Sequence, residues 1–527
     1  MRQLCLALPI VVIGCASVPV DPPAVLPEAE LAAADARLAE GCYDCLLDAR
    51  DRYGRLADGP FRSTLLPRLF EAELLIARRE QELALPASSS IARARVVAAE
   101  LPIEYGADRL LRLAEALPDV AAGVARRERR TLREAPEDLL GRGLAAELEW
   151  IPSSGLREPV RRYLIAAIEC ASDGAVPTAP ALASAGTRPT VTAVAPAADP
   201  PLLVYAEALC GRVRRPGPFE SVRALVPAFR EASLPLSEIF LGLINDEGPT
   251  RALAAAADAY ERFADSPAVT LTYAAIHYRA GNYDDALRLY DETLALRPAH
   301  EDAWLGRAVC LSVLNRYEEA IAAATVLIDA SADNRAEAYY WRAWNHRRLE
   351  RLPPARDDIE RAKRLAASID IYTLAGSIAY EQDRLDAAEA DLLAARAISM
   401  PRSCTAAWYL GLVPMRRERW PAGATAFESA MTCFQGSLAG HQAGRAALRA
   451  NTIMDPVFKA RQIALADEAI TEARRQMHAA AMNAAKNFAL AGNRVRARQL
   501  GDRASADPAL ASEVEVLREY LERLGPP

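Results

Sequence analysis

Aromatic residues and alternating β-branched runs, which are typical of strands, are both scarce in this sequence. Phe, Trp and Tyr make up 6% of its 527 residues, whereas apolar residues of all kinds make up 51%. Ala, Leu, Arg and Glu dominate, and all four are strong helix formers. We therefore predict an all-α protein. A chain this long exceeds one compact core unless it forms a repeat array, in which each unit packs only on its neighbours.

A strong net charge is also missing. The formal charge is −7, and acidic and basic residues are interspersed along the chain. Nucleic-acid binding would need a basic stripe, and the short cluster Arg126-Arg127-Glu128-Arg129-Arg130 is better interpreted as a solvated helix face. We expect no nucleic-acid partner.

The usual catalytic and cofactor motifs are absent. The sequence has no Gly-x-x-x-x-Gly-Lys loop, no strand-bound Gly-x-Gly-x-x-Gly and no Gly-x-Ser-x-Gly elbow. Its five histidines form no His-Glu-x-x-His pattern and have no acidic partner at a ligand spacing. We predict no cofactor, no metal site and no catalytic residue.

The N-terminus has the layout of a secretory signal. Arg2 is followed by an apolar stretch, residues 4–13, which is too short to span a membrane. Val12-Ile13-Gly14-Cys15 resembles the lipobox of bacterial lipoproteins. The resemblance implies that Cys15 becomes the first mature residue and carries several acyl chains, which hold a protein firmly to a bilayer. A plain signal peptide with an incidental Cys15 is the alternative.

The residue after the lipobox cysteine bears on location. Ala16, rather than Asp, follows Cys15, and this is similar to outer-membrane cargo among Gram-negative lipoproteins. The resemblance therefore implies an anchored lipoprotein in the outer membrane, facing the periplasm.

One pattern recurs at nearly constant spacing from about Pro267 to Gly436. A large residue followed three positions later by a small one occurs five times, and successive copies are 34, 35, 33 and 35 residues apart. The five copies are Tyr283/Ala286, Tyr317/Ala320, Leu352/Ala355, Leu385/Ala388 and Trp420/Gly423. Twelve residues before each small residue stands another small one: Ala274, Ala308, Ala343, Gly376 and Gly411. Four residues after it, a large residue stands in four of the five copies: Tyr290, Ile359, Leu392 and Phe427.

This pattern resembles the tetratricopeptide repeat, whose period is near 34 residues with two helices per unit. The resemblance implies a right-handed α-solenoid of helical hairpins, in which the small residues let the two helices of a unit approach closely. It also implies that the first helices of successive units line a concave groove.

The repeat pattern and the local composition together divide the whole chain into segments. We predict a signal peptide at 1–14, a tether at 15–28, an N-terminal lobe of degenerate repeat-like hairpins at 29–172 and an Ala/Pro/Thr-rich linker at 173–201. A diverged helical region at 202–266 then leads into five repeats at 267–437. C-terminal helices at 438–527 supply a further repeat-like unit and a cap.

Carrying the family's groove positions onto this chain selects a set rich in Tyr, Trp, Met and Arg, which are enriched at protein interfaces. The set comprises Tyr278, Arg279, Tyr340, Trp344, Arg347, Arg348, Tyr380, Trp408, Met415 and Arg416. Packing between helices is the alternative role for the aromatic members. The basic and Asn-containing clamp that some family members use for acidic C-termini is not matched.

An exported protein meets an oxidising compartment, so cysteines can pair. Cys404 and Cys433 stand at helix ends that antiparallel packing brings together, and we predict a disulfide between them. Cys170 and Cys210 flank the linker and form a second possible pair. Cys42-Tyr43-Asp44-Cys45 has redox-like spacing but no βαβ context, so a local disulfide or two inert thiols are favoured over a redox site.

We therefore expect a non-catalytic scaffold or adaptor in the bacterial envelope that binds other envelope proteins in its groove. An enzyme or enzyme accessory with its site in the N-terminal lobe is the main alternative, and residues 61–172 carry the least certain fold. A spacer without a specific ligand is a third hypothesis. The oligomeric state stays open.

Overall fold

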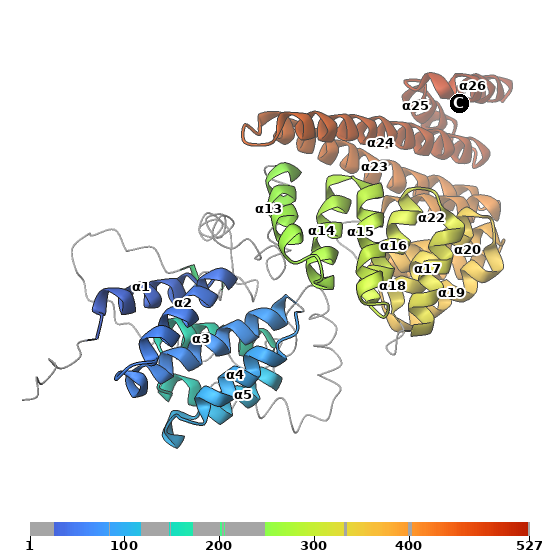
Figure 1. Cartoon of the computed structure of the whole chain (residues 1–527). Coiled ribbons are helices and arrows are strands. Elements are labelled where there is room, and N and C mark those ends of the chain that lie inside the picture. Colours follow the sequence, from blue (N-terminus) through green and yellow to red (C-terminus); the bar gives the residue numbers. More distant parts are fainter. Residues whose placement is uncertain are drawn as a thin grey trace, which may run out of the picture.

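The computed structural model describes residues 26–116, 147–171 and 248–524, with gaps at 84, 148, 331–334 and 399–402, together with residues 201, 202 and 205. Every regular element in this part of the chain is a helix, as the sequence predicts (Figure 1). Cys15, Cys210 and nearly all of the predicted linker lie outside the described residues.

The N-terminal helices form a lobe around one central helix. α3 (Arg62–Glu82) contacts α2 (Tyr43–Ala57), α4 (Ser88–Ala98) and α5 (Ala107–Ala116), and α1 (Glu28–Glu40) packs on α2. α8 (Glu158–Ala171) contributes Val160, Tyr163 and Leu164 to the same core. The last turns of α3 are buried on nearly all sides, including charged residues, so α3 is the axis of this lobe.

A regular stack of helical hairpins follows α13 (Pro249–Arg262). The leading helices of the five units are α14 (Pro267–Ala280), α16 (Glu301–Val313), α18 (Ala336–Arg348), α20 (Ile369–Glu381) and α22 (Cys404–Arg416). The trailing helices are α15 (Tyr283–Leu296), α17 (Tyr317–Ala330), α19 (Leu352–Leu365), α21 (Leu385–Ile398) and α23 (Trp420–Ala450). Leading helices contact the leading helices of neighbouring units, so they form one continuous layer.

Each hairpin turns through one residue with positive φ. This residue is Gly281, Asn315, Glu350, Asp383 or Glu418, with φ between 56° and 80°. The residue that follows each left-handed residue donates its backbone N–H to a carbonyl oxygen of the leading helix. Asn282 N–H donates to His277 O at 2.9 Å, and Arg316 N–H donates to Leu311 O at 2.8 Å. This is the hydrogen bond that ends a helix through a left-handed residue, and its recurrence explains the constant period of the sequence pattern.

Small residues on leading helices lie against large ones on trailing helices. A β-carbon added to Gly376 of α20 would stand 2.5 Å from Leu392 Cγ on α21. Ala343 and Ile359 are likewise buried together in one core cluster. The pairing predicted from the sequence is therefore the pairing that sets the distance between the two helices of a unit.

The fifth trailing helix departs from the predicted boundary. α23 continues to Ala450, so the expected end of the repeats after residue 437 falls inside one helix. The segment from 437 to 450 is rich in Ala and has no proline, so nothing in it interrupts helical hydrogen bonding. α24 (Pro456–Leu490) then runs back antiparallel to it, and we call this pair the long hairpin.

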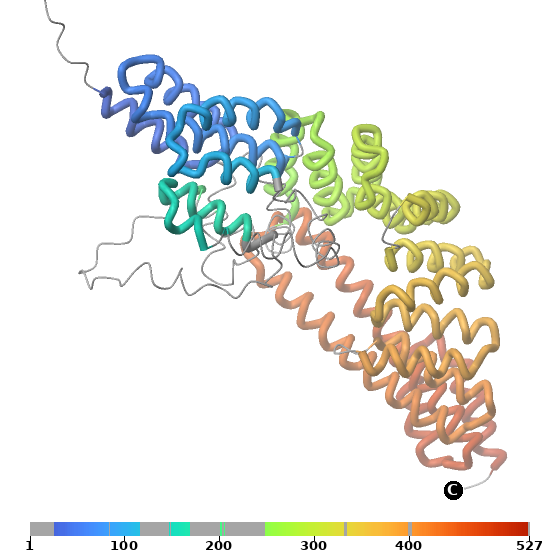
Figure 2. Tube along the Cα trace, turned by 90° about the horizontal axis from the view of Figure 1, so that it is seen from below, coloured from blue at the N-terminus to red at the C-terminus, as the bar shows by residue number. Residues whose placement is uncertain are grey.

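The long hairpin reaches back across the repeat array to its first unit (Figure 2). Met454 and Phe458 at its tip are buried in the core that contains Ala252 of α13 and Ile276 of α14. Arg461 donates to Ala280 O at 3.0 Å and to Gly281 O at 3.2 Å, at the end of α14. The array is therefore closed into a ring by contacts between its two ends.

Beyond the long hairpin, α24 pairs with α25 (Arg494–Ala504), and α26 (Ala511–Arg523) packs on both. Gly492 forms the turn between α24 and α25 with φ 85°. The expected sixth repeat-like unit therefore consists of the end of α24 with α25, and α26 covers its apolar face through Val514, Leu517 and Leu521.

Candidate functional site

Three successive leading helices are joined by one arginine. Arg347 of α18 donates from Nη2 to Glu381 Oε1 of α20 at 2.6 Å and from the same nitrogen to the Tyr409 hydroxyl of α22 at 3.0 Å. Burial disfavours the charge of Arg347, but the hydrogen bond and charge of Glu381 outweigh burial and raise the pKa of Arg347. Arg347 therefore links three successive members of the layer of leading helices, which we call the inner layer.

An aromatic cluster lies beside Arg347 on α18. Trp341 packs edge-on against both Tyr340 and Trp344, with centroids 5.5 and 5.9 Å apart. All three rings are half-buried, and burial raises the pKa of Tyr340 to about 12. Tyr317 of α17 packs against Trp344 at 6.0 Å. The array thus presents ordered, partly exposed aromatic surface.

Arg348 lies over this aromatic cluster. Its guanidinium carbon is 5.6 Å from the centroid of Trp344 and 5.5 Å from that of Tyr317, within the range of cation–π attraction. Nε and Nη2 of Arg348 donate to the Tyr317 hydroxyl at 3.2 and 3.1 Å. Among the described residues, Arg348 has no carboxylate within ion-pair distance.

A second aromatic–arginine group continues along the layer. Tyr380 of α20 packs edge-on against Tyr409 of α22 at 5.5 Å. Arg416 lies 5.1 Å from the Tyr380 centroid and pairs with Asp383 at 3.3 Å. Tyr340, Trp344, Arg347 and Arg348 thus lie together on α18, and Arg347 joins them through Glu381 and Tyr409 to the group that contains Tyr380 and Arg416.

Other residues of the predicted groove set serve packing instead. Trp408 lies edge-on to Phe427 and Phe434 of α23 at 5.4 and 6.4 Å, and Met415 packs against the same core. Tyr278 packs on Tyr283 at 5.5 Å. Arg279 is exposed on α14. The contacts therefore favour packing for Trp408 and Tyr278, which is the alternative stated for the aromatic members, and they place Met415 in the same core as Trp408.

Sequence reasoning missed two members of the inner layer, Trp341 and Tyr409. Each stands next to a residue that was selected, Tyr340 or Trp408. Neither residue stands at a repeat position that lines the groove in the family, so the carry-over of groove positions selected neither. A test for aromatic residues one position from each groove register would have found them.

Four of the five histidines lie in packing environments, and the fifth, His441, is exposed. His277, His300 and His478 are buried, and burial lowers the pKa of each, to about 4 for His300. Burial also lowers the pKa of His346. Within the described ranges, no three His, Cys, Asp or Glu residues are placed to hold a metal ion.

The N-terminal lobe contains a buried polar network around α3. Glu82 is fully buried and accepts hydrogen bonds from Tyr205 at 2.6 Å, from Arg79 at 2.8 Å and from Tyr163. Burial raises the pKa of both tyrosines. The carboxylate thus has three donors, and buried charges with such partners commonly serve structure. The enzyme hypothesis gains no site from this cluster.

A second network binds α8 to the same helix. Glu71 accepts from the backbone N–H of Arg157 at 2.9 Å, from the Arg157 guanidinium and from the Tyr105 hydroxyl at 3.2 Å. Arg157 also reaches Asp35 and donates to the Tyr53 hydroxyl at 3.0 Å. Composition and periodicity gave no signal for either network, because these residue types are mostly exposed.

Among the described residues, four cysteines are paired. Cys404 at the start of α22 and Cys433 in α23 form the disulfide that the sequence suggests, with Cα atoms 5.5 Å apart. Cys42 and Cys45 form a second, local one. Cys310 is a buried free thiol, and burial raises its pKa to about 12. Cys170 lies in α8, and its proposed partner Cys210 is outside the described residues.

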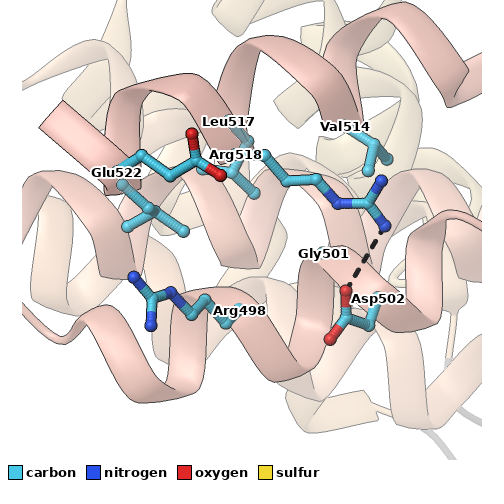
Figure 3. A pocket seen from close by; sticks show the side chains of 8 residues that line it. Arg498, Gly501, Asp502, Val514, Leu517, Arg518 and Glu522 are labelled. Atoms are coloured by element: carbon cyan, nitrogen blue, oxygen red, sulfur yellow. Dashed lines mark ion pairs between the residues drawn. The ribbon is translucent and has the colours of Figure 1, made fainter. Parts of the chain in front are cut away.

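A pocket of about 320 Å³ lies between α25 and α26. Figure 3 shows Arg498, Asp502, Arg518 and Glu522 around its rim, with Arg518 paired to Asp502 at 3.5 Å. Val514, Leu517 and Leu521 form its apolar part. Its charges alternate in sign and no lining residue is a nucleophile, so we assign the pocket to the packing of the terminal cap.

No helix in the described part of the chain combines the length and apolar character needed to cross a bilayer.

Comparison with known proteins agrees with the repeat geometry. Residues 271–335 match the family model described as tetratricopeptide repeat. No curated protein matches the chain.

Three of the similar solved structures show the range of the likeness. YrrB, described as a TPR protein with an unusual peptide-binding site, is 19% identical over 34% of this chain and 93% of its own, with a TM-score of 0.31. PilW, a type IV pilus biogenesis factor, is 16% identical over 48% and 97%, with a TM-score of 0.35. A tetratricopeptide repeat protein from Parabacteroides merdae is 14% identical over 54% and 96%, with a TM-score of 0.33. The family match lies within five hairpins that turn through equivalent left-handed residues, so this part of the chain has the geometry of tetratricopeptide repeats.

Proposed function

We propose that the chain is a protein-binding scaffold that takes an extended partner segment along the inner layer of α18, α20 and α22. The observation that carries this proposal is the position of Arg348, which is exposed, held over Trp344 and Tyr317, and paired with a phenol oxygen but no carboxylate among the described residues. Arg347 and Arg416 already have Glu381 and Asp383 as partners. Arg348 is therefore the cation left to receive an acidic group.

The surroundings of Arg348 favour a partner that is both acidic and apolar. Trp341 and Trp344 are half-buried and ordered by mutual edge contacts, so a ligand that covers them loses little side-chain freedom in the protein. Trp, Tyr and Arg are the residue types that dominate binding energy at interfaces. We infer a segment with an apolar side chain over the tryptophans and a carboxylate at Arg348.

Capture of partners from the producing organism tests the groove. Trp344→Ala and Arg348→Glu are each expected to reduce recovery of bound partners at least about tenfold, the effect of losing one interface hot spot. Arg356→Glu is the matched control, because Arg356 is a partly exposed arginine on trailing helix α19 that pairs only with the adjacent Asp357 in the described structure. Equal recovery by all three variants would refute the groove.

We further propose that the scaffold is held to the bacterial envelope, at the outer membrane facing the periplasm, by lipid on Cys15. The support is the lipobox-like sequence of residues 12–15. The test is the mass of the mature N-terminus together with membrane fractionation of Cys15→Ser. An unmodified N-terminus, or a variant that stays in the membrane fraction, would contradict anchoring.

A further inference from the structure

The turn between α1 and α2 places two cysteines at a helix N-terminus. Cys42 is the N-cap residue of α2, and its Sγ accepts a hydrogen bond from the backbone N–H of Cys45 at 3.1 Å. The two residues form a disulfide across one helical turn. Cys42 is 7% exposed and Cys45 is 2% exposed, so both residues are buried and Cys42 is the less completely covered of the two.

A carboxylate accompanies the inner cysteine. Glu40 Oε2 lies 3.2 Å from Cys45 Sγ and also pairs with Arg37. In the reduced state, the helix N-terminus and the Cys45 N–H stabilise a thiolate at Cys42, and Glu40 stands where it can accept the proton of the Cys45 thiol. These are the two requirements of a dithiol pair that exchanges with other disulfides: a stabilised attacking thiolate and a base for the second thiol.

The two residues between the cysteines join the N-terminal lobe to the repeats. The Tyr43 ring packs on Phe263, the residue that ends α13, at 5.7 Å, and its hydroxyl donates to Glu80 at 3.1 Å. Asp44 forms an ion pair with Arg262 of α13. The conformation of the Cys42–Cys45 turn therefore bears directly on the contact between α2 and α13.

We propose that Cys42 and Cys45 form a thiol–disulfide exchange site that reacts with an external dithiol and whose redox state controls the contact between α2 and α13. The donor thiolate attacks Cys42 Sγ, the bond between the two cysteines breaks, and Cys45 leaves with the electron pair and takes a proton delivered through Glu40. The second donor thiol then attacks its partner sulfur in the mixed disulfide and releases Cys42 as a thiolate. Two electrons pass to the protein, and the donor becomes a disulfide.

The Cys42–Cys45 site differs from the second disulfide in the described part of the chain. Cys404 and Cys433 are separated by 29 residues and join α22 to α23, so reduction there opens a long loop. Cys42 and Cys45 are three residues apart within one turn, so exchange leaves the rest of the fold covalently unchanged. The second disulfide is thus an internal reference in the same molecule.

The test uses the purified full chain in dithiothreitol at pH 7, with timed alkylation and peptide mass measurement. Cys42 and Cys45 are expected to be alkylated at least about tenfold faster than Cys404 and Cys433. Reoxidation by oxidised dithiothreitol is expected to slow on the order of 10²-fold in Glu40→Gln, the usual effect of losing a positioned base. Asp51→Asn, an exposed carboxylate paired with Arg50 on α2, is the matched control.

Hydrogen exchange measures the coupling between the redox state of Cys42 and Cys45 and the contact between α2 and α13. On reduction, and equally in a Cys42→Ser/Cys45→Ser variant, residues 249–262 are expected to exchange faster while residues 352–398 do not change. The proposal is overturned if Cys42 and Cys45 react only in denaturant or no faster than Cys404 and Cys433. It is also overturned if Glu40→Gln reoxidises at the rate of Asp51→Asn, or if exchange in α13 is independent of the redox state.

Discussion

Gly411 of α22 lies against the face of Phe427 of α23, so closely that a β-carbon on Gly411 would stand 2.7 Å from Phe427 Cδ1. Gly411→Ala is therefore expected to destabilise the protein by about 1–3 kcal/mol through overpacking, despite the better helix propensity of Ala. Urea unfolding followed by circular dichroism measures the effect. Gly436→Ala is the control, because its β-carbon would meet nothing within 4 Å, and it should be neutral or stabilising.

Trp344 and Trp408 both belong to the predicted groove set but have different surroundings. Trp408 packs on Phe427 and Phe434, so Trp408→Ala should lower the free energy of unfolding by about 2–4 kcal/mol. Trp344 contacts other half-buried rings at the inner surface, so its replacement should affect unfolding by about 1 kcal/mol and partner binding far more. A larger loss of stability in Trp344→Ala than in Trp408→Ala would contradict this division.

The same two tryptophans show how far a sequence pattern reaches. The hairpins were predictable because their turns depend on residues close in sequence, such as Gly281 and Tyr283, repeated at a constant period. The role of Trp408 was not, because it depends on Phe434, in a helix that continues well beyond an ordinary unit. The buried pairing of Arg79 with Glu82 and Tyr205 could not be predicted from the sequence either. Partners far apart in sequence decide whether a charge can be buried.

The turn between α18 and α19 contains a residue that glycine should improve. Glu350 has φ 58° and is exposed, and a left-handed conformation costs a residue with a side chain about 1–2 kcal/mol. Glu350→Gly removes that strain but adds freedom to the unfolded chain. A net stabilisation of about 0.5–1 kcal/mol is expected, measured as a higher urea midpoint.

In a helix interior, a substitution of Glu by Gly is expected to have the opposite effect on stability. Glu468 is exposed within α24, and Glu468→Gly should destabilise by about 1 kcal/mol at most. The left-handed assignment fails if Glu350→Gly destabilises as Glu468→Gly does.

His300, the N-cap residue of α16, should make stability depend on pH. Burial, followed by the nearby charge of Arg297, lowers its pKa from 6.5 to about 4. In the unfolded chain His300 takes up a proton as pH falls through about 6.5, whereas the folded protein resists it, so stability falls with pH between 6.5 and 4. The loss amounts to about 3 kcal/mol at most.

Comparison with His300→Gln isolates this contribution. The difference in unfolding free energy between the parent chain and the variant should be constant above pH 7 and shrink by up to about 3 kcal/mol towards pH 4. Unfolding in urea at several pH values measures it. A difference that does not vary with pH would show that His300 titrates alike in both states.

The contact that closes the ring can be opened without disturbing the repeats. Arg461 donates to two carbonyls at the end of α14, where the helix dipole favours a cation, and Phe458 is buried beside it. Hydrogen bonds from a charged group contribute about 1.5–3 kcal/mol, so Arg461→Ala should raise the hydrogen-exchange rate of residues 437–450 and 456–470 by about 10- to 100-fold. Phe458→Ala should act in the same direction.

Protection in α16 to α21 should stay unchanged in both variants, because these helices do not contact the tip residues Met454 and Phe458. Leu465→Ala is the matched control, since Leu465 is about half exposed at 48% and lies in the first third of α24. If Leu465→Ala loosens the long hairpin as much as Arg461→Ala does, its stability comes from pairing of α23 with α24 alone. In that case the contact with α14 does not hold the ring closed.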